Sequence, residues 1–281
     1  MTLTHVLLPT DFSETTAEPV RHARLLADHF GAALHVLHVA TDVERQRTAD
    51  AELERFARAH GLDGATLAVI AAEAPAPGIE AYAGEHGADL VVMGSHGRRG
   101  LERLFLGSVT EEVLRHAPCP VLTVRTHLDA ADQLPVDSVL APIDLSDASL
   151  RALPFARTFA AAYDARLDVL HVVEDIDLPA IYGEDIANPL HELFPEVQQR
   201  TRGEIERALA AAPGPEVPTA IHFAQGHAAD AIVDFAEDEG SDLIVLTRTG
   251  RRGLTRFLLG SATDGVVRTA PCPVLVVPVT E

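Results

Sequence analysis

Short runs of apolar residues alternate along the chain with longer stretches in which apolar positions recur at helical spacing. In the first half we expect helices over residues 13–30, 50–60, 79–85 and 109–116, and strands over residues 6–8, 33–39, 66–71, 90–93 and 121–124. Strands that are apolar throughout and separated by helices are typical of a parallel sheet covered by helices on both faces. The pattern therefore predicts an α/β fold built from five-stranded, doubly wound parallel sheets.

The second half repeats this pattern. Asp144 follows Asp11 by 133 residues in a matching context, whereas Cys272 follows Cys119 by 153 residues, each cysteine within Ala-Pro-Cys-Pro-Val. The extra residues of the second half fall within 174–212, where they form either a lid or contact surface or a plain surface excursion. A polar stretch over residues 127–136 reads as the linker. The chain of 281 residues is thus expected to form two domains, residues 1–128 and 137–281.

A glycine-rich segment follows the fourth apolar run of the first half. It reads Gly94-Ser-His-Gly97, then nine residues, then Gly107-Ser108. Gly94 directly follows a predicted buried strand, where the absence of a Cβ lets the backbone approach a ligand closely and adopt a positive φ. Doubly wound sheets bind ligands beyond the carboxyl ends of their strands, which is where this segment lies.

The end of this segment has the signature of a helix start. Ser108 is predicted to be the N-cap, and Glu111 three residues later completes a capping box, a pairing that Ser261 and Asp264 repeat in the second half. A helix start presents unpaired N–H groups and about half a positive charge, which suits a phosphate. A single copy is equally consistent with an ordinary cap and turn. Its recurrence in both halves, beside a recurring aspartate, favours a nucleotide site.

Charge and composition restrict the function further. The formal net charge is −20, from 42 acidic against 22 basic residues, and every basic residue is Arg. Such a balance argues against nucleic acid and anionic membranes as partners. The absence of Lys excludes a Walker-type phosphate loop and a lysine nucleophile. No signal peptide or membrane span is predicted, so we expect a cytoplasmic protein. We expect its two cysteines to be packing residues rather than zinc ligands or a disulfide.

Several separated motifs together resemble the universal stress protein family in its tandem two-domain form. They are Pro9-Thr-Asp-Phe-Ser13, Leu37-His-Val39, the glycine pattern of the phosphate loop, and Pro-Cys-Pro-Val-Leu-x-Val ending at Val124. The resemblance implies a Rossmann-like fold with strand order 3-2-1-4-5 in each half and, in one branch of the family, an ATP site. It also implies an internal pseudo-dimer about the last strands of the two halves. Whether two chains form a further homodimer is left open.

The resemblance also assigns residues to the site. It implies that Asp11, with Pro9 and Thr10 before it, and the backbone of Val39 receive the adenosine. The ribose and phosphates would lie against Met93, Gly94, His96, Gly97, Gly107, Ser108, Val109 and Thr110. The matching residues of the second half are Asp144, Val172, Gly250, Gly260, Ser261, Ala262 and Thr263.

Charged groups near the phosphates are harder to assign. Arg98 and Arg251 each follow the central glycine, and a guanidinium suits phosphate oxygens, although a solvated loop arginine explains each equally well. Mg²⁺ is a natural companion of ATP, but no cluster of carboxylates predicts a metal site of the protein's own. The 14 histidines are scattered along the chain, so pH sensing is not favoured.

Thr247 makes the second copy different from the first, because it stands where Gly94 stands in the first half. A Cβ at this position would crowd a ligand at the strand end, and a positive φ would be costly for a β-branched residue. We expect the second site to bind ATP more weakly, to bind a smaller nucleotide, or to be empty.

Three functions remain open. The first is an ATP-binding, regulatory stress-response protein without catalytic residues. The second is a slow ATPase or autophosphorylating protein that uses Ser108 or Thr110 in the same pocket. The third is an interaction scaffold whose pockets are vestigial. A phosphate cradle without an evident base favours the first over the second, and one intact copy favours the first over the third.

Overall fold

The computed structural model describes residues 3–13, 16–95, 106–125, 136–174, 189–249 and 259–279. In the first half the strands are β1 His5–Pro9, β2 Ala33–Ala40, β3 Thr66–Ala71, β4 Leu90–Gly94 and β5 Val121–Val124. The helices are α1 Ala17–Phe30, α2 Val43–Ala59, α3 Pro75–Glu85 and α4 Ser108–His116. The alternation of strands and helices confirms the α/β prediction.

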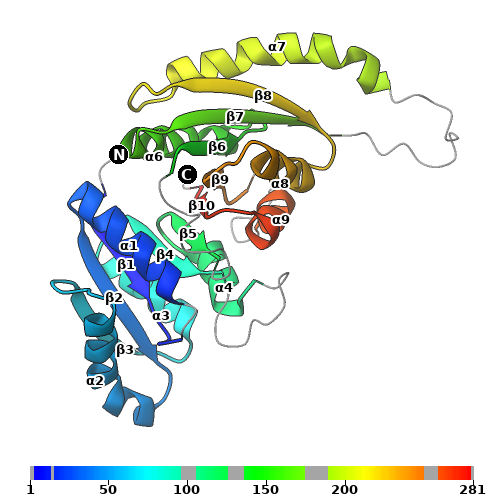
Figure 1. Ribbon diagram of the computed structural model, residues 1–281. Helices are drawn as coiled ribbons and strands as arrows, with labels where there is room; N and C mark the ends of the chain where they lie inside the picture. Colours follow the sequence, from blue (N-terminus) through cyan, green and yellow to red (C-terminus); the bar gives the residue numbers. More distant parts are fainter. Residues whose placement is uncertain are drawn as a thin grey trace, which may run out of the picture.

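The second half repeats these elements, with additional helices. Its strands are β6 Ser138–Pro142, β7 Arg166–Val173, β8 Thr219–Gln225, β9 Leu243–Thr247 and β10 Val274–Val277. Its helices are α5 Asp147–Leu150, α6 Leu153–Tyr163, α7 Pro189–Ala211, α8 Ala228–Asp238 and α9 Ser261–Thr269. The long helix α7 occupies most of the described part of the predicted insertion and lies along β8 (Figure 1).

All four helices of the first half begin elsewhere than expected, α4 by a single residue, since it begins at Ser108 rather than at residue 109. Helix α1 begins at Ala17 rather than at residue 13, because Ser13 belongs to a turn closed by Asp11. Helix α3 begins at Pro75 rather than at residue 79, since proline is well suited to a first helical turn, where its missing N–H costs nothing. Helix α2 begins at residue 43 rather than 50; residues 46–48 are exposed and show no apolar periodicity.

The strands form one sheet in the order β3-β2-β1-β4-β5-β10-β9-β6-β7-β8. Each half therefore has the order 3-2-1-4-5, as expected, and all pairs within a half are parallel. The halves join where β5 and β10 pair antiparallel, with Leu122 opposite Leu275 (Figure 1). This pairing is the expected internal pseudo-dimer. It covers two wholly buried strands that would otherwise be exposed apolar edges.

Each face of the sheet carries a core that continues across both halves. Along β1, Leu8 belongs to the core on one face and Leu7 to the core on the other, as the two-residue repeat of a strand requires. The first core includes side chains from α1, α2 and α6, and the second includes side chains from α3, α4, α8 and α9. No helix in the described ranges has both the length and the apolar character needed to cross a bilayer.

Arg248 and Arg125 each reach across to the C-terminal end of a helix in the other half. Arg248 donates to the carbonyl oxygen of Ala117, the C-cap of α4, at 2.8 Å. Arg125 donates to the carbonyl oxygen of Ala270, the C-cap of α9, at 2.7 Å. A cation at a helix C-terminus interacts favourably with the helix dipole and its unpaired carbonyls. The two arginines are not equivalent in sequence, yet they perform the same task on equivalent helices.

Candidate functional site

The chain leaves the first strand of each half through the same turn. The Asp11 carboxylate accepts from the backbone N–H of Ser13 at 3.0 Å and from the Ser13 hydroxyl at 2.5 Å. Asp144 accepts from the N–H and hydroxyl of Ser146 at 2.9 and 2.5 Å. These aspartates thus fix the backbone at the carboxyl end of β1 and β6, which is the edge where doubly wound sheets bind ligands.

The residue after each aspartate has an unusual backbone conformation, which the sequence analysis missed. Phe12 and Leu145 both have a φ of 62°. Bulky residues rarely adopt this left-handed region, and such outliers concentrate at functional sites. A signal was present in the sequence only as the repeated Asp-x-Ser, because nothing in the residue type of Phe12 or Leu145 predicts a positive φ.

Aromatic contacts support the turn in the first half. The ring of Phe12 stacks on His38 with centroids 4.3 Å apart and planes 22° apart. His38 Nδ1 lies 2.9 Å from the carbonyl oxygen of Thr10 and must donate to it, since a carbonyl only accepts. His171 makes the same bond to the carbonyl of Ile143 in the second half. Both histidines have hydrogen-bonded roles within the fold.

Val39, predicted to receive the adenosine, lies near the carboxyl end of β2 under the first turns of α3. A Cβ added to Gly78 would lie 2.9 Å from Cγ1 of Val39 and 3.1 Å from Cβ of Ala72. Glycine at position 78 therefore allows α3 to approach the strand closely. The sequence analysis did not single out Gly78, because a lone glycine inside a helical pattern has many explanations.

The helix after the phosphate loop is fixed against the preceding strand in the same way in both halves. The Thr110 hydroxyl donates to the carbonyl of Gly94, and the Thr263 hydroxyl donates to that of Thr247, both at 2.8 Å. At the base of the loops, the N–H of Gly107 donates to Ser95 O, as the N–H of Gly260 does to Arg248 O. Thr110 and Thr263 are therefore buried structural residues of the site.

The prediction that Ser108 and Ser261 are N-caps is wrong. Gly107 and Gly260 have extended backbone and are the N-caps, without a side-chain cap, and the serines are the first helical residues. The carbonyl of Gly107 accepts the first intrahelical bond from the N–H of Glu111 at 2.8 Å. A glycine cap leaves the first N–H groups without a side-chain acceptor, and both serines are exposed.

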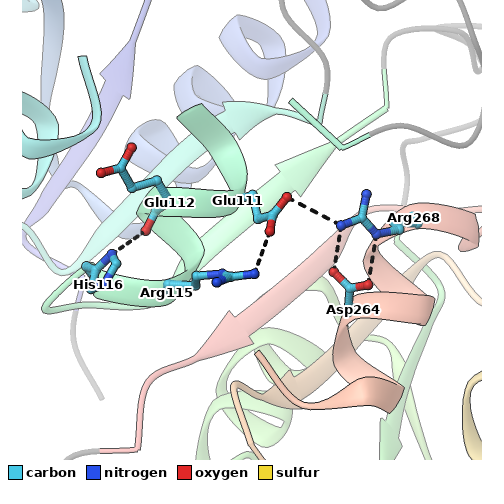
Figure 2. A network of polar contacts seen from close by, with 6 residues as sticks. All are labelled: Glu111, Glu112, Arg115, His116, Asp264 and Arg268. Atoms are coloured by element: carbon cyan, nitrogen blue, oxygen red, sulfur yellow. Dashed lines mark hydrogen bonds and ion pairs between the residues drawn. The ribbon is translucent and has the colours of Figure 1, made fainter. Parts of the chain in front are cut away.

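The capping box is replaced by a network between the halves. Glu111 accepts from Arg115 at 2.5 Å and reaches Arg268 of α9 at 3.4 Å (Figure 2). Asp264 accepts two bonds from Arg268, each at 2.9 Å. The acidic residues expected to close the first turns of α4 and α9 therefore bind arginines instead, and the contact between Glu111 and Arg268 ties the two helices together.

Gly94 and Thr247 end equivalent strands in equivalent registers, opposite Val124 and Val277. Neither residue has a positive φ, so the strand end does not use this freedom of Gly94, and the cost considered for Thr247 does not arise. Strand pairing holds both residues in extended backbone. The difference is confined to the side chain: Thr247 is buried, and its hydroxyl donates to the carbonyl of Thr249 at 3.1 Å.

The strand order brings most of the predicted site residues of each half to one edge of the sheet. Strands β1, β2 and β4 are neighbours, so Asp11, Val39 and Gly94 lie at adjacent strand ends, beside the start of α4. Five predicted residues, His96, Gly97, Arg98, Gly250 and Arg251, lie outside the described residues. Within the described residues, no group of three or more His, Cys, Asp or Glu side chains could hold a metal ion.

The two cysteines are buried and unpaired with each other. Burial raises the pKa of both thiols to about 12, so both stay protonated near neutral pH. They are packing residues, as expected.

Comparison with known proteins gives a consistent result. A model of the universal stress protein family matches residues 2–125 and again residues 135–278. A universal stress protein of Methanocaldococcus jannaschii is 35% identical over 139 residues, which are 50% of this chain and 80% of that protein. One of Mycobacterium tuberculosis is 32% identical over 190 residues, 67% of this chain and 61% of that protein.

Solved structures share the fold over nearly the full length. A universal stress protein of Archaeoglobus fulgidus has a TM-score of 0.69 at 21% identity and covers 98% of each chain. A functionally unknown protein of Pseudomonas aeruginosa has a TM-score of 0.72 at 20% identity, with 98% of this chain and 92% of that chain covered.

Proposed function

The chain belongs to the universal stress protein family, and we propose that its first half binds an adenine nucleotide, ATP, in a cytoplasmic stress response that is regulatory rather than metabolic. The observation that carries the proposal is the start of α4. It is capped by Gly107 alone and begins at the same sheet edge as the Asp11 turn and the end of β2.

The phosphate end of the ligand is supported by this helix start. The N–H groups of the first turn point out of the helix, and a helix N-terminus favours an anion by about 0.3–1 kcal/mol or more when partly buried. This local attraction matters in a chain of net charge −20, which repels an anion at long range. Ser108 is exposed at the first helical position, where its hydroxyl can add to the backbone donors.

The adenosine end is supported by β1 and β2. Asp11 stands at the end of β1 in a turn that the Phe12–His38 stack holds in place. The Val39 side chain packs against Gly78 on the α3 side of the sheet, and the backbone of Val39 would receive the adenine. Asp11 would hydrogen-bond the sugar or base, and Mg²⁺ would accompany the phosphates with ligands from the nucleotide and water.

Binding without catalysis is favoured by the position of the Thr110 hydroxyl. Thr110 donates its only hydroxyl proton to the Gly94 carbonyl, which holds the hydroxyl against the strand rather than toward a phosphoryl group. Regulation would then depend on whether the site holds a nucleotide, because a nucleotide that bridges α4 and the Asp11 turn stabilises both.

The second half is proposed to bind ATP weakly or not at all. Its backbone frame matches that of the first half, with Asp144, Gly260 and Thr263 making the same hydrogen bonds. Thr247 adds a Cβ, a methyl group and a hydroxyl at the strand end, where the first half has only a hydrogen. We attribute the difference between the sites to this residue.

The proposal is tested with the aspartates as a matched pair. Asp11→Ala and Asp144→Ala remove the same turn from different halves, so the two variants should lose similar amounts of folding stability. Isothermal titration with Mg-ATP is expected to show a loss of affinity of about tenfold or more for Asp11→Ala, because a hydrogen bond to a charged group is lost. Asp144→Ala should bind as the unmodified protein does.

Two results would contradict the proposal. One is the absence of nucleotide, both after denaturation of the purified protein and in the titration. The other is equal affinity of the two variants. Steady formation of ADP that Asp11→Ala abolishes would instead support a slow ATPase.

A further inference from the structure

Three histidines from distant parts of the chain meet at the edge of the sheet opposite the candidate site. His5 begins β1, His35 lies early in β2, and His86 follows α3 as its C-cap. The ring centroids of His5 and His35 are 5.7 Å apart, and those of His35 and His86 are 5.9 Å apart. Tyr82 of α3 stacks on His86 at 3.8 Å. The three imidazoles therefore form a cluster between the end of α3 and the start of two strands.

Hydrogen bonds fix the protons on two of these rings. The Thr4 hydroxyl donates its proton to Asp89 at 2.6 Å, so His5 Nδ1, 3.0 Å from the same hydroxyl oxygen, is the donor of that contact. His86 Nδ1 donates to the carbonyl of Tyr82 at 3.0 Å. In the neutral form of both rings, Nδ1 therefore carries the proton and Nε2 is the acceptor.

Among the residues that the structure describes, the groups that face His35 offer no negative charge. Strand β1 presents His5, and α3 presents His86 and Tyr82, whose hydroxyl lies 3.0 Å from His35 Nδ1. Strand β3 pairs Thr66 with His35 and has no ionisable side chain. Asp89, which precedes β4, faces His5 and accepts from its backbone N–H. A proton on either neighbour of His35 is thus repelled by a second proton on His35.

Burial lowers the pKa of His35, and the neighbouring His5 and His86 lower it further. A histidine whose pKa is depressed in the folded state stabilises the fold while it is neutral. That contribution is complete above its ordinary value of 6.5 and is lost as the pH falls, because the unfolded chain then binds more protons.

The second half has different residues at the equivalent positions. Ser138, Asp168 and Glu239 replace the three histidines. Asp168 accepts from the Ser138 hydroxyl at 3.0 Å and lies 2.9 Å from His222 Nε2. His222 therefore lies against a carboxylate, whereas His35 in the first half lies against the imidazoles of His5 and His86.

We propose that His5, His35 and His86 form a proton-sensitive lock that holds the C-terminal end of α3 on β1 and β2 at neutral pH and releases it in mild acid. The other end of α3 contains Gly78, packed against Val39, so release reaches the candidate site. The lock is confined to the first half. Helix α8, which occupies the place of α3 in the second half, remains in position over the same pH range.

Hydrogen exchange followed by mass spectrometry tests this on the full chain without nucleotide, so the outcome does not depend on ATP binding. Exchange is measured at about pH 7.5 and about pH 5.5, which span the titration of histidine, and is corrected for intrinsic rates. Opening of residues 75–85 is expected to increase by about threefold or more in acid, while that of residues 228–238 changes by less than about twofold.

Variants separate the lock from general acid unfolding. His35→Gln can keep a hydrogen bond to Tyr82 and should remove most of the acid response of residues 75–85. His86→Gln is the second variant, for the case in which His35→Gln folds poorly. It changes no strand residue and should also reduce the acid response of residues 75–85. Equal acid responses of α3 and α8, or a full response of α3 in both variants, would overturn the proposal.

Discussion

Asp89 and Asp242 occupy equivalent positions but have opposite electrostatic environments. Each carboxylate accepts backbone N–H groups at the start of the neighbouring strand, and Thr4 adds a hydroxyl donor to Asp89 at 2.6 Å. Burial opposes ionisation of Asp89, but bonds from Thr4 and the strand outweigh it and lower its pKa. In the second half Asp137 replaces Thr4, and burial together with this negative neighbour raises the pKa of Asp242.

Asp137→Thr should therefore stabilise the protein at neutral pH by about 1 kcal/mol, because it removes a like charge and adds a donor. The sign follows from the shift: a carboxyl whose folded pKa is raised destabilises the fold once it ionises, so the gain disappears as the pH falls below about 4. Urea unfolding at several pH values measures this. Thr4→Asp is the mirror control and should destabilise at neutral pH.

Gly78 and Gly84 lie in the same helix but in different surroundings. A Cβ at Gly78 would meet Val39 at 2.9 Å, whereas one at Gly84 has no atom within 4 Å. Gly78→Ala should destabilise the protein by about 1–2 kcal/mol through overpacking. Gly84→Ala should stabilise it by up to about 1 kcal/mol through helix propensity. Equal thermal shifts for the two variants would show that the close approach of α3 to Val39 has no energetic weight.

Helices α4 and α9 connect the two candidate sites to the interface between the halves. Their N-termini lie at the phosphate loops, and their C-caps accept from Arg248 and Arg125 of the opposite half. Glu111 and Arg268 join the helices directly (Figure 2). The elements that would receive phosphate are thus the same elements that hold the halves together.

Arg125→Ala should cost about 1–2 kcal/mol of stability, because the α9 C-terminus loses a partly buried cation and its hydrogen bonds. Arg58→Ala provides a control, since Arg58 pairs with Glu54 at the surface with side chains 65% and 61% exposed. Such exposed pairs contribute little, and a change below about 0.5 kcal/mol is expected. Chemical denaturation measures the free energy of unfolding of both variants. If Arg125→Ala leaves it unchanged, Arg125 does not stabilise the interface between the halves.

The repeated apolar runs were sufficient to predict the strands and, with the family resemblance, their order, since buried parallel strands have a strong local signal. The helix starts were harder. Glu111 does not close its own helix cap: it binds Arg115 of the same helix at 2.5 Å and reaches Arg268, 157 residues away, at 3.4 Å. Local sequence does not reveal the second of these contacts. The positive φ of Phe12 and the meeting of three scattered histidines also depend on tertiary structure rather than on neighbours in sequence.

The ten-stranded sheet places two nearly identical frames about the antiparallel β5–β10 pair. The aspartate turns, the strand-end carbonyls bound by threonine hydroxyls and the glycine caps recur in both. Because these hydrogen bonds and caps are repeated, each half serves as an internal control for the other. The functional asymmetry that we propose then rests on few residues, foremost the exchange of Gly94 for Thr247.

The stoichiometry of ATP binding tests this asymmetry most directly, by isothermal titration or native mass spectrometry of the full chain with Mg-ATP. We expect one tightly bound ATP per chain, none after Gly94→Thr, and a second after Thr247→Gly. Far-UV circular dichroism of each variant verifies that the frame is intact. Two equivalent ATP molecules bound to the unmodified chain, or one bound ATP that persists after Gly94→Thr, would contradict the account.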